Sequence, residues 1–340
     1  ANAIATGATL PRSTSLTFCH FLSHGVALVA KRIHNMSNPN HRRPSLYDDI
    51  PCIIAETGTL TTRGIECALY KWSPPNKDEK IRGVAVVYHG FGAHSLYPTV
   101  RYASSLLAEN GLLVYGLDFP GHGASPGKRG LLTGVDDLIE DGIAVAIHAM
   151  TDSSKNGDLP LFLVGSSMGG AISLAVANRI TDTVDGVVML APMLSLSVGS
   201  SARKALGWLN SIAPTVPLIP SSATSPEMQY RDAERRAECK RNTLTYKGYM
   251  RPQSALTCVE FTNQIQQSFH KVAVPFLCMI AEEDVVVDNS KAKELMKKSP
   301  SGDKTLKSYA ALHGLLCEPA PLLGIIEDDF VQWLLERCKP

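Results

Sequence analysis

One pentapeptide of this chain has the residue types and spacing of an activated nucleophile. Residues 165–169 read Gly-Ser-Ser-Met-Gly, which places a serine in a Gly-x-Ser-x-Gly pattern. Between a strand and a helix this pattern predicts a nucleophile elbow, because the glycines permit a tight turn that holds the serine hydroxyl at the helix N-terminus. The central serine, Ser167, is therefore the candidate nucleophile.

The residues on either side of the pentapeptide have the composition that an elbow requires. Residues 161–164 form a short, continuous apolar run, as in a strand buried on both faces of a sheet. Residues 170–177 are small and apolar, as in a helix packed on a sheet. The alternative is a turn with an ordinary exposed serine, since short glycine–serine matches often arise by chance. The strand–turn–helix context favours a nucleophile.

A serine nucleophile needs a base to remove its proton and a carboxylate to orient that base. In the α/β-hydrolase order, the acid and then the histidine follow the serine along the chain. Only His270 and His313 follow Ser167 in this sequence. His270 precedes a predicted strand, whereas His313 lies just after the predicted strand 305–309, at the sheet edge where the base must lie. His313 is therefore the predicted base.

The predicted acid comes from a carboxylate-rich loop. Residues 281–284 read Ala-Glu-Glu-Asp and follow the predicted strand 276–280, so their side chains fall at the same sheet edge as His313. Asp284 is our choice, and Asp288 and Glu283 remain alternatives. An acidic loop that only faces solvent is the other interpretation.

The developing charge on the substrate oxygen requires two backbone N–H donors. The amide of Met168, directly after the nucleophile, is the first candidate. The second is Phe91, because residues 89–92 read His-Gly-Phe-Gly after the predicted strand 83–88, and the glycines let the backbone approach a substrate carbonyl. We interpret His89 as structural, since no second metal ligand is suitably spaced.

No cofactor or metal is expected. Residues 121–128 are rich in glycine but lack the spacing of a phosphate-binding loop, and Arg129 stands where Ser or Thr should follow the lysine. The eight cysteines are scattered without a Cys-x-x-Cys pair, which argues against a zinc site and suits reduced thiols in a cytosolic-type compartment. The net charge of +1 gives no electrostatic case for nucleic acid binding.

Strand and helix patterns alternate from about residue 53 onward. The predicted strands are a hairpin over 59–72 that turns at Arg63 and Gly64, then 83–88, 112–117, 161–164, 186–190, 275–281 and 305–309. The predicted helices are 97–110, 136–150, 170–177, 290–298 and 322–336. This alternation predicts an α/β fold with a mostly parallel central sheet and helices on both faces.

Residues 193–270 interrupt the alternation and are predicted to form a helical cap or lid. Residues 201–213 carry an apolar helical stripe, which is followed by three prolines and a charged stretch. The stripe consists of Ala205, Trp208, Leu209 and Ile212. It could cover a pocket or touch a lipid surface, or it could simply pack on the core. The predicted domain organisation is a leader over 1–47 and a hydrolase core over 48–192 and 271–340, with the cap over 193–270 between the two core parts.

The leader differs in composition from the rest of the chain. Residues 1–47 contain no Asp or Glu but include five Lys or Arg residues, which is compatible with an organelle transit peptide. We favour a disordered tail, or upstream sequence that is not normally translated, since Met36 could be the first residue of a shorter product. No apolar run approaches the length of a membrane span. We expect a cytoplasmic or peripheral membrane protein.

Together these motifs resemble the monoacylglycerol lipase and lysophospholipase-like serine hydrolases. The matching segments are 88–95, 118–125, 165–170, 191–193, 274–276, Asp284 with Asp288, and 304–307 followed by His313 and Glu318. The similarity covers roughly residues 55–337 and is weakest in the cap. It implies an α/β-hydrolase fold, a triad of Ser167, Asp284 and His313, oxyanion donors at Phe91 and Met168, and a mobile cap over an acyl channel.

The resemblance also sets the functional expectation, which is hydrolysis of a monoacylglycerol or lysophospholipid ester through an acyl-enzyme. One departure from the commoner family pattern is Phe91 in place of a small residue, which narrows the acyl entrance but leaves a backbone donor intact. Plant caffeoylshikimate-type esterases share much of the pattern, so an esterase or thioesterase for small soluble or phenolic substrates is the alternative. A non-catalytic ligand-binding homologue is a third interpretation.

Overall fold

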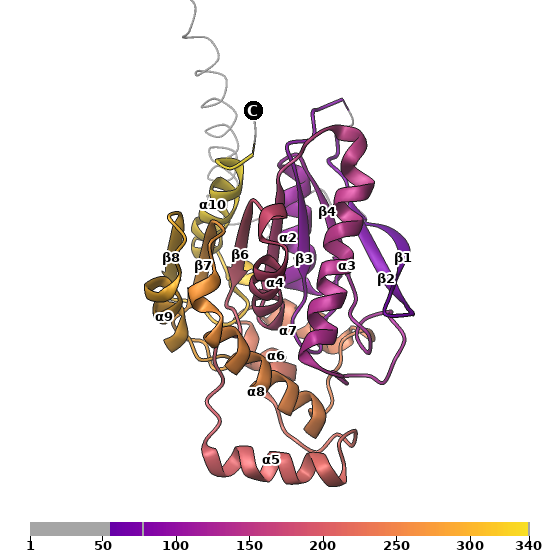
Figure 1. Ribbon diagram of the computed structural model, residues 1–340, viewed down its shortest axis with the longest axis vertical. Helices are drawn as coiled ribbons and strands as arrows, with labels where there is room; N and C mark the ends of the chain where they lie inside the picture. The colour runs from indigo at the N-terminus through magenta and orange to yellow at the C-terminus, as the bar shows by residue number, and fades with distance from the viewer. Residues whose placement is uncertain (1–54, 77, 339–340) are drawn as a thin grey trace, which may run out of the picture. The chain divides into compact units, whose positions relative to one another are not determined.

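A computed structural model describes residues 55–76 and 78–338, and the predicted leader over 1–47 lies outside them (Figure 1). The described residues form an eight-stranded sheet in the order β1-β2-β4-β3-β5-β6-β7-β8. The strands are β1 (Glu56–Thr62), β2 (Ile65–Trp72), β3 (Gly83–Tyr88), β4 (Leu112–Leu117), β5 (Leu161–Ser166), β6 (Gly186–Leu190), β7 (Phe276–Ala281) and β8 (Lys304–Tyr309). Only the pairs β1–β2 and β2–β4 are antiparallel, which confirms the mostly parallel sheet.

Helices cover both faces of this sheet. They are α2 (Pro98–Glu109), α3 (Val135–Ser153), α4 (Met168–Arg179), α5 (Ser200–Ile212), α6 (Pro226–Gln229), α7 (Ala233–Arg241), α8 (Pro252–Gln267), α9 (Ser290–Lys298) and α10 (Leu322–Leu335). In Figure 1, α3, α4 and α8 lie in front of the sheet, and α2 and α10 lie behind it. The α/β fold with helices on both faces of the sheet, expected from the alternation of strands and helices, is confirmed.

The central strands are buried along their whole length. Every residue of β3, β4, β6 and β7 is buried, as expected for apolar runs covered by helices on both faces. The edge strand β1, by contrast, is polar and largely exposed. The burial of these strands fixes the sheet, and so fixes the positions of the loops that leave its carboxyl edge.

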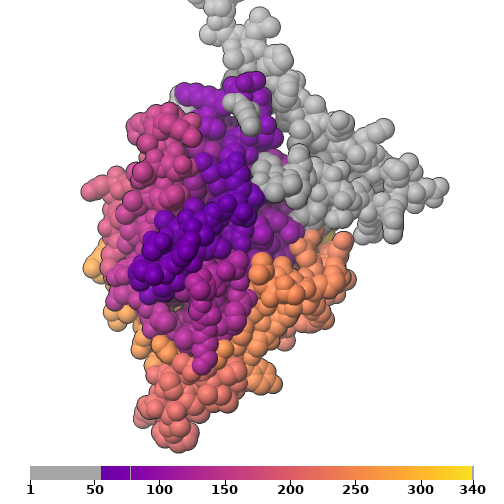
Figure 2. Space-filling model, turned by 90° about the vertical axis from the view of Figure 1, so that its right-hand side faces the viewer, coloured from indigo at the N-terminus to yellow at the C-terminus, as the bar shows by residue number. Residues whose placement is uncertain are grey.

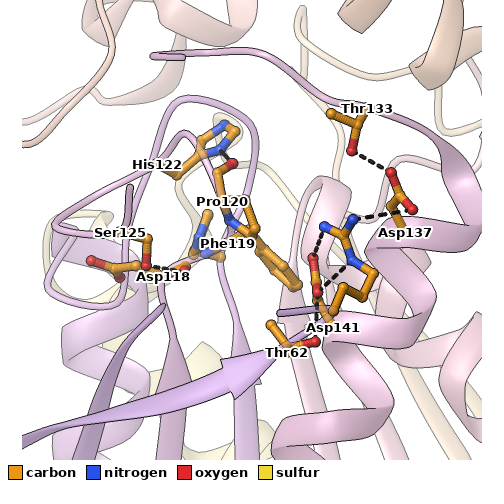
Figure 3. A network of polar contacts seen from close by, with 11 residues as sticks. Thr62, Asp118, Phe119, Pro120, His122, Ser125, Thr133, Asp137 and Asp141 are labelled. Atoms are coloured by element: carbon orange, nitrogen blue, oxygen red, sulfur yellow. Dashed lines mark hydrogen bonds and ion pairs between the residues drawn. The ribbon is translucent and has the colours of Figure 1, made fainter. Parts of the chain in front are cut away.

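The antiparallel hairpin is attached to helix α3 by a charged cluster (Figure 3). Arg63 occupies the turn with a φ of 50° and binds both carboxylate oxygens of Asp141, at 2.9 and 2.8 Å. It also pairs with Asp137 at 3.1 Å, and the Thr62 hydroxyl donates to Asp141 at 2.7 Å. Asp141 is fully buried, so its negative charge must be compensated within the protein. The guanidinium of Arg63 and the hydroxyl of Thr62 provide this compensation.

The elbow requires a very close approach between backbone segments. A Cβ atom on Gly165 would lie 2.0 Å from the Gly169 carbonyl oxygen, and one on Gly169 would lie 2.1 Å from the Tyr88 carbonyl oxygen. Helix α4 therefore touches both β5 and β3 through positions that no larger residue can occupy. This contact sets the direction in which the nucleophile elbow leaves the sheet.

A substitution at this contact is therefore expected to destabilise the fold. Gly169→Ala should lower the free energy of unfolding by more than about 3 kcal/mol, because neither contacting backbone can move away. The measurement is urea unfolding followed by circular dichroism. Gly207→Ala is the matched control, since a Cβ there meets nothing within 4 Å, and this helical position should gain roughly 0.5–1 kcal/mol. Equal stabilities of the two variants would contradict the packing argument.

The insertion between β6 and β7 contains helices α5 to α8. Helix α8 packs against α3 and α4, with buried residues along one side. Helix α5 contacts α8 and buries Leu206, but Trp208 and Ile212 are 65% and 62% exposed. The apolar stripe expected on this helix therefore does not pack onto the core. Whether residues 193–270 act as a lid remains a prediction.

Candidate active site

The predicted nucleophile lies at the sharp turn between β5 and α4. Ser167 has a φ of 58° and a ψ of −119°, a backbone conformation that costs about 1–3 kcal/mol for a residue other than glycine. Its N–H donates to the Leu190 carbonyl oxygen at 2.9 Å, and its carbonyl accepts from the Met193 N–H at 2.9 Å. The end of β6 thus holds the strained residue from both sides, so the hydroxyl stays at the N-terminus of α4.

The predicted base and acid are in direct contact. His313, in the loop after β8, has its Nδ1 2.7 Å from Oδ2 of Asp284, in the loop after β7. Both side chains are almost fully buried. The other carboxylate oxygen of Asp284 accepts the N–H groups of Val286 and Val287 at 2.8 and 3.0 Å. With Nδ1 donating to a carboxylate, Nε2 of His313 is the nitrogen able to accept a proton.

The alternative residues named from the sequence lie elsewhere. Asp288 accepts the hydroxyl of Ser195 and the N–H of Ser290. Glu283 is about half exposed and pairs with Arg231. His270 is exposed in a short 3-10 helix. Of the residues considered, only Asp284 and His313 form a carboxylate–imidazole pair in the described part of the chain.

Ser167 and His313 line the same cavity. This space amounts to about 390 Å³, including the part open to solvent. Its walls come from the loop after β3, helix α2, the elbow, the insertion and the loop after β8, and consist of Gly90, Phe91, Ala93, Tyr97, Thr99, Val100, Ser166, Ser167, Ala223, Gln229, Tyr230, His313 and Gly314. No hydrogen bond joins the Ser167 hydroxyl to His313 in this structure, and such bonds commonly tighten only when substrate is bound.

The two predicted oxyanion donors lie on either side of the serine. Met168 is the first residue of α4, and Phe91 belongs to the loop that passes beside the elbow. A Cβ on Gly90 would lie 3.1 Å from the Ser167 Cβ, so this loop passes close to Ser167. Neither the Phe91 nor the Met168 amide donates a hydrogen bond to another described residue. Both are therefore available to an oxygen of a bound substrate.

His89 supports the loop of Phe91 through both of its ring nitrogens. Its Nδ1 lies 2.8 Å from the Gly90 carbonyl oxygen, and its Nε2 accepts the Phe119 N–H at 3.0 Å. Because one ring nitrogen faces a carbonyl and the other an amide, the imidazole is neutral with its proton on Nδ1. Both nitrogens are used by the backbone, so His89 has the structural role expected from the sequence.

Asp118 is a supporting residue that the motif analysis did not assign. Its carboxylate accepts the N–H groups of Ser95 and Ala124, at 2.6 and 2.8 Å. It thereby ties the loop after β3 to the loop after β4, which also carries His122 (Figure 3). The signals in the sequence were its place directly after the predicted strand 112–117 and its inclusion in the family-like segment 118–125. Among residues 55–76 and 78–338, no cluster of His, Cys, Asp or Glu could hold a metal ion.

Three buried histidines support this region in their neutral form. Burial lowers the pKa of His89 and His94 to about 4, and that of His122 to about 3. Histidines of the unfolded chain titrate near pH 6.5, so below that pH the unfolded state binds protons that the buried imidazoles of the folded state do not bind. Their contribution to stability is therefore complete above pH 6.5 and declines as the pH falls toward 4.

We expect the free energy of unfolding to fall as the pH is lowered from 7 to 4.5, on the order of 1–3 kcal/mol per buried histidine. Urea unfolding at a series of pH values, followed by tryptophan fluorescence, measures this slope. His122→Asn should flatten it, whereas replacing the exposed His270 by Gln should leave it unchanged. A slope that is the same in wild type and His122→Asn would contradict the assignment.

With the site described, comparison with known proteins places the chain in a class. Residues 79–320, more than half of the chain, match the family described as Serine aminopeptidase, S33. The chain belongs to this family of hydrolases.

Particular relatives are more specific. The chain is 27% identical to a caffeoylshikimate esterase from Arabidopsis thaliana, over 77% of this chain and 80% of that protein. It is also 27% identical to a monoacylglycerol lipase from Mycolicibacterium smegmatis, over 81% of this chain and 94% of that protein. A monoglyceride lipase from Mus musculus is similar at 27% identity, over 86% of this chain and 92% of that protein.

The fold is shared with a solved structure of a soluble variant of monoglyceride lipase from Saccharomyces cerevisiae in complex with a substrate analog. That structure has a TM-score of 0.76 at 20% identity and covers 86% of this chain and 98% of the other. The resemblance to monoacylglycerol lipases predicted from the motifs is thus confirmed. No helix in the described part of the chain is both long and apolar enough to cross a bilayer.

Proposed function

We propose that this protein hydrolyses carboxylic esters through an acyl-enzyme, with Ser167 as nucleophile, His313 as base and Asp284 as the orienting acid. The single observation that carries the proposal is the 2.7 Å contact between His313 Nδ1 and Asp284 Oδ2, beside a cavity that Ser167 also lines. A strained serine at a helix N-terminus, an oriented imidazole and unused amides together form the arrangement that acyl transfer requires.

The reaction proceeds in two steps. His313 Nε2 takes the proton of Ser167 while the serine oxygen attacks the ester carbonyl, and the amides of Phe91 and Met168 stabilise the resulting oxyanion. His313 then protonates the leaving alcohol, and in the second step it activates the water that releases the acid. Asp284 remains ionised and holds the imidazolium that forms in each step.

The substrate that we propose is a monoacylglycerol, with lysophospholipid as a related substrate. Support comes from the relatives named monoacylglycerol and monoglyceride lipases, each of which the chain matches over most of its length. The similarity to caffeoylshikimate esterase keeps a phenolic ester as the second candidate. The aminopeptidase activity in the family description is less well supported, because no carboxylate lines the described cavity to bind a substrate ammonium group.

Ser167→Ala is expected to abolish covalent labelling by a fluorophosphonate and to reduce monoacylglycerol hydrolysis by on the order of 10⁶-fold, because no other group replaces the nucleophile. Gel-based labelling and titration of released fatty acid are the measurements. Ser166→Ala, at the neighbouring half-buried position, serves as the matched control and should still be labelled.

Persistent labelling of Ser167→Ala would refute the nucleophile assignment, and an unlabelled wild type would favour the non-catalytic interpretation. A panel of monoacylglycerol, lysophosphatidylcholine, a caffeoyl ester and a short p-nitrophenyl ester ranks the substrates. A rate on the caffeoyl ester that exceeds the acylglycerol rate would replace the proposed substrate by a phenolic one.

We further propose that the exposed side of α5 docks on a lipid surface. Trp208, Ile212, Val216 and Leu218 are each more than 40% exposed. The segment also carries Arg203 and Lys204, while residues 186–226 contain no Asp or Glu. Figure 2 shows this part of the chain in salmon at the lower end of the view, with its atoms at the surface. An apolar helix face with adjacent cations suits an anionic bilayer surface.

The double variant Trp208→Ser/Ile212→Ser is therefore expected to bind phosphatidylcholine–phosphatidylglycerol vesicles about tenfold or more weakly, because it loses two apolar anchors. Vesicle co-sedimentation measures binding, and hydrolysis of a short soluble ester should stay unchanged. Ile325→Ser is the control, because Ile325 is 55% exposed on α10, outside the insertion. Equal vesicle binding by the double variant and wild type would refute the docking surface.

A further inference from the structure

One arginine of the insertion joins the two loops that carry Asp284 and His313. Arg231 lies between α6 and α7, and its Nε is 3.0 Å from Oε2 of Glu318, in the segment that follows His313. Its Nη2 is 2.5 Å from Oε1 of Glu283, the residue before Asp284. The same nitrogen donates to the Ala310 carbonyl oxygen at 3.3 Å. One planar group thus contacts the acid loop once and the base loop twice.

Glu318 links Arg231 to the backbone beside His313. Its side chain is 2% exposed, and its Oε1 accepts the N–H of Leu312, next to His313, at 2.6 Å. Burial, and to a smaller extent the nearby Glu283 carboxylate, raise the pKa of Glu318, while the Leu312 amide and Arg231 oppose that rise. The buried carboxylate therefore has a hydrogen bond to the backbone beside His313 on one side and a cation on the other, which favours its charged form.

The loop of His313 needs such support because the sheet stops short of it. Backbone bonds continue the pairing of β7 with β8 as far as Glu282 N–H to Tyr309 O and Glu283 N–H to Ala311 O, at 2.8 and 3.0 Å. His313 lies two residues beyond the last of these bonds. Its backbone is then held by Glu318 at Leu312 and by the insertion at Gly314.

The insertion makes its contact with Gly314 through the two residues before Arg231. The Gly314 N–H donates to the Gln229 carbonyl oxygen at 2.9 Å. A Cβ on Gly314 would lie 2.4 Å from the Tyr230 ring, so the two segments are in tight contact. Residues 229–231 therefore contact the loop of His313 both before and after this residue in the chain, and so help to hold its backbone in place.

We propose that Arg231 is a positioning residue, which acts through Glu318 and Glu283 to hold His313 and Asp284 at their working separation and couples this part of the insertion to the triad. The proposal rests on the proposed function, since it assigns a role relative to those two residues. It also predicts that residues 229–231 stay in place during turnover, so any motion of the insertion is confined to other parts such as α5.

The test compares Arg231→Met, Arg231→Lys, Glu318→Gln and the control Lys240→Met on a short soluble ester. We expect Arg231→Met and Glu318→Gln to lower kcat by about ten- to a hundredfold with KM changed less than about twofold, because a small displacement of a reacting group has an effect of this size. Arg231→Lys should recover part of the loss, since it restores the charge but not the fork. Lys240→Met breaks an exposed ion pair with Glu227 inside the insertion and should behave as wild type.

The pH profile separates positioning from a general loss of structure. Without Arg231, Glu318 becomes charged only at a higher pH, so the kcat of Arg231→Met should recover as the pH is raised, whereas that of Glu318→Gln should stay low at every pH. If Arg231→Met does not fold, Glu283→Gln removes only the exposed arm of the bridge, and a kcat loss of about two- to fivefold is expected.

Several results would overturn the proposal. These are an unchanged kcat in Arg231→Met and Glu318→Gln, or a pH-independent loss in Arg231→Met that Lys240→Met shares. They are distinguishable from failure of the proposed function, because wild type would still be labelled at Ser167 by a fluorophosphonate in these cases. Absence of that labelling would refute the proposed function instead.

Discussion

The strained turn at Ser167 is the constraint on which the site depends. A non-glycine residue is held at a φ of 58° because helix α4 contacts the backbone of both β5 and β3, through Gly165 and Gly169. The burial of the central strands offsets the local strain, which costs only a small part of the free energy gained from a core of this size. The turn projects the hydroxyl at the helix N-terminus, where the amide of Met168, one of the two predicted oxyanion donors, also lies.

The remaining parts of the site reach the serine because parallel strands end at a common edge. The loops after β3, β5, β7 and β8 bring together Phe91, Ser167, Asp284 and His313, which are far apart in the chain. Each loop has its own support. His89 and Asp118 bind the loop of Phe91, two amides bind Asp284, and Glu318 binds the backbone beside His313. Positioning therefore depends on buried polar groups whose hydrogen bonds are made within the loops.

The insertion between β6 and β7 has two parts with different surroundings. Residues 229–231 contact the loop of His313 and, through Arg231, the residue beside Asp284. Helix α5 instead exposes Trp208 and Ile212 and contacts α8 with its other side. In our proposals the first part supports the triad and the second meets the lipid. One insertion would then serve both membrane contact and the positioning of the reacting residues.

The sequence alone determined the order of the strands and of the helices outside the insertion, and the identity of the nucleophile candidate. The predicted strands 83–88, 112–117 and 186–190 coincide with β3, β4 and β6, because apolar runs covered on both faces leave a clear local signal. The sequence favoured Asp284 as the acid, but its spacing left Asp288 and Glu283 as alternatives, since all three follow the same strand. Only the tertiary structure shows that Asp284 contacts His313, that the apolar stripe of α5 is exposed and that Arg231 pairs with Glu318. These features depend on how residues distant in the chain pack together, which local sequence patterns do not encode.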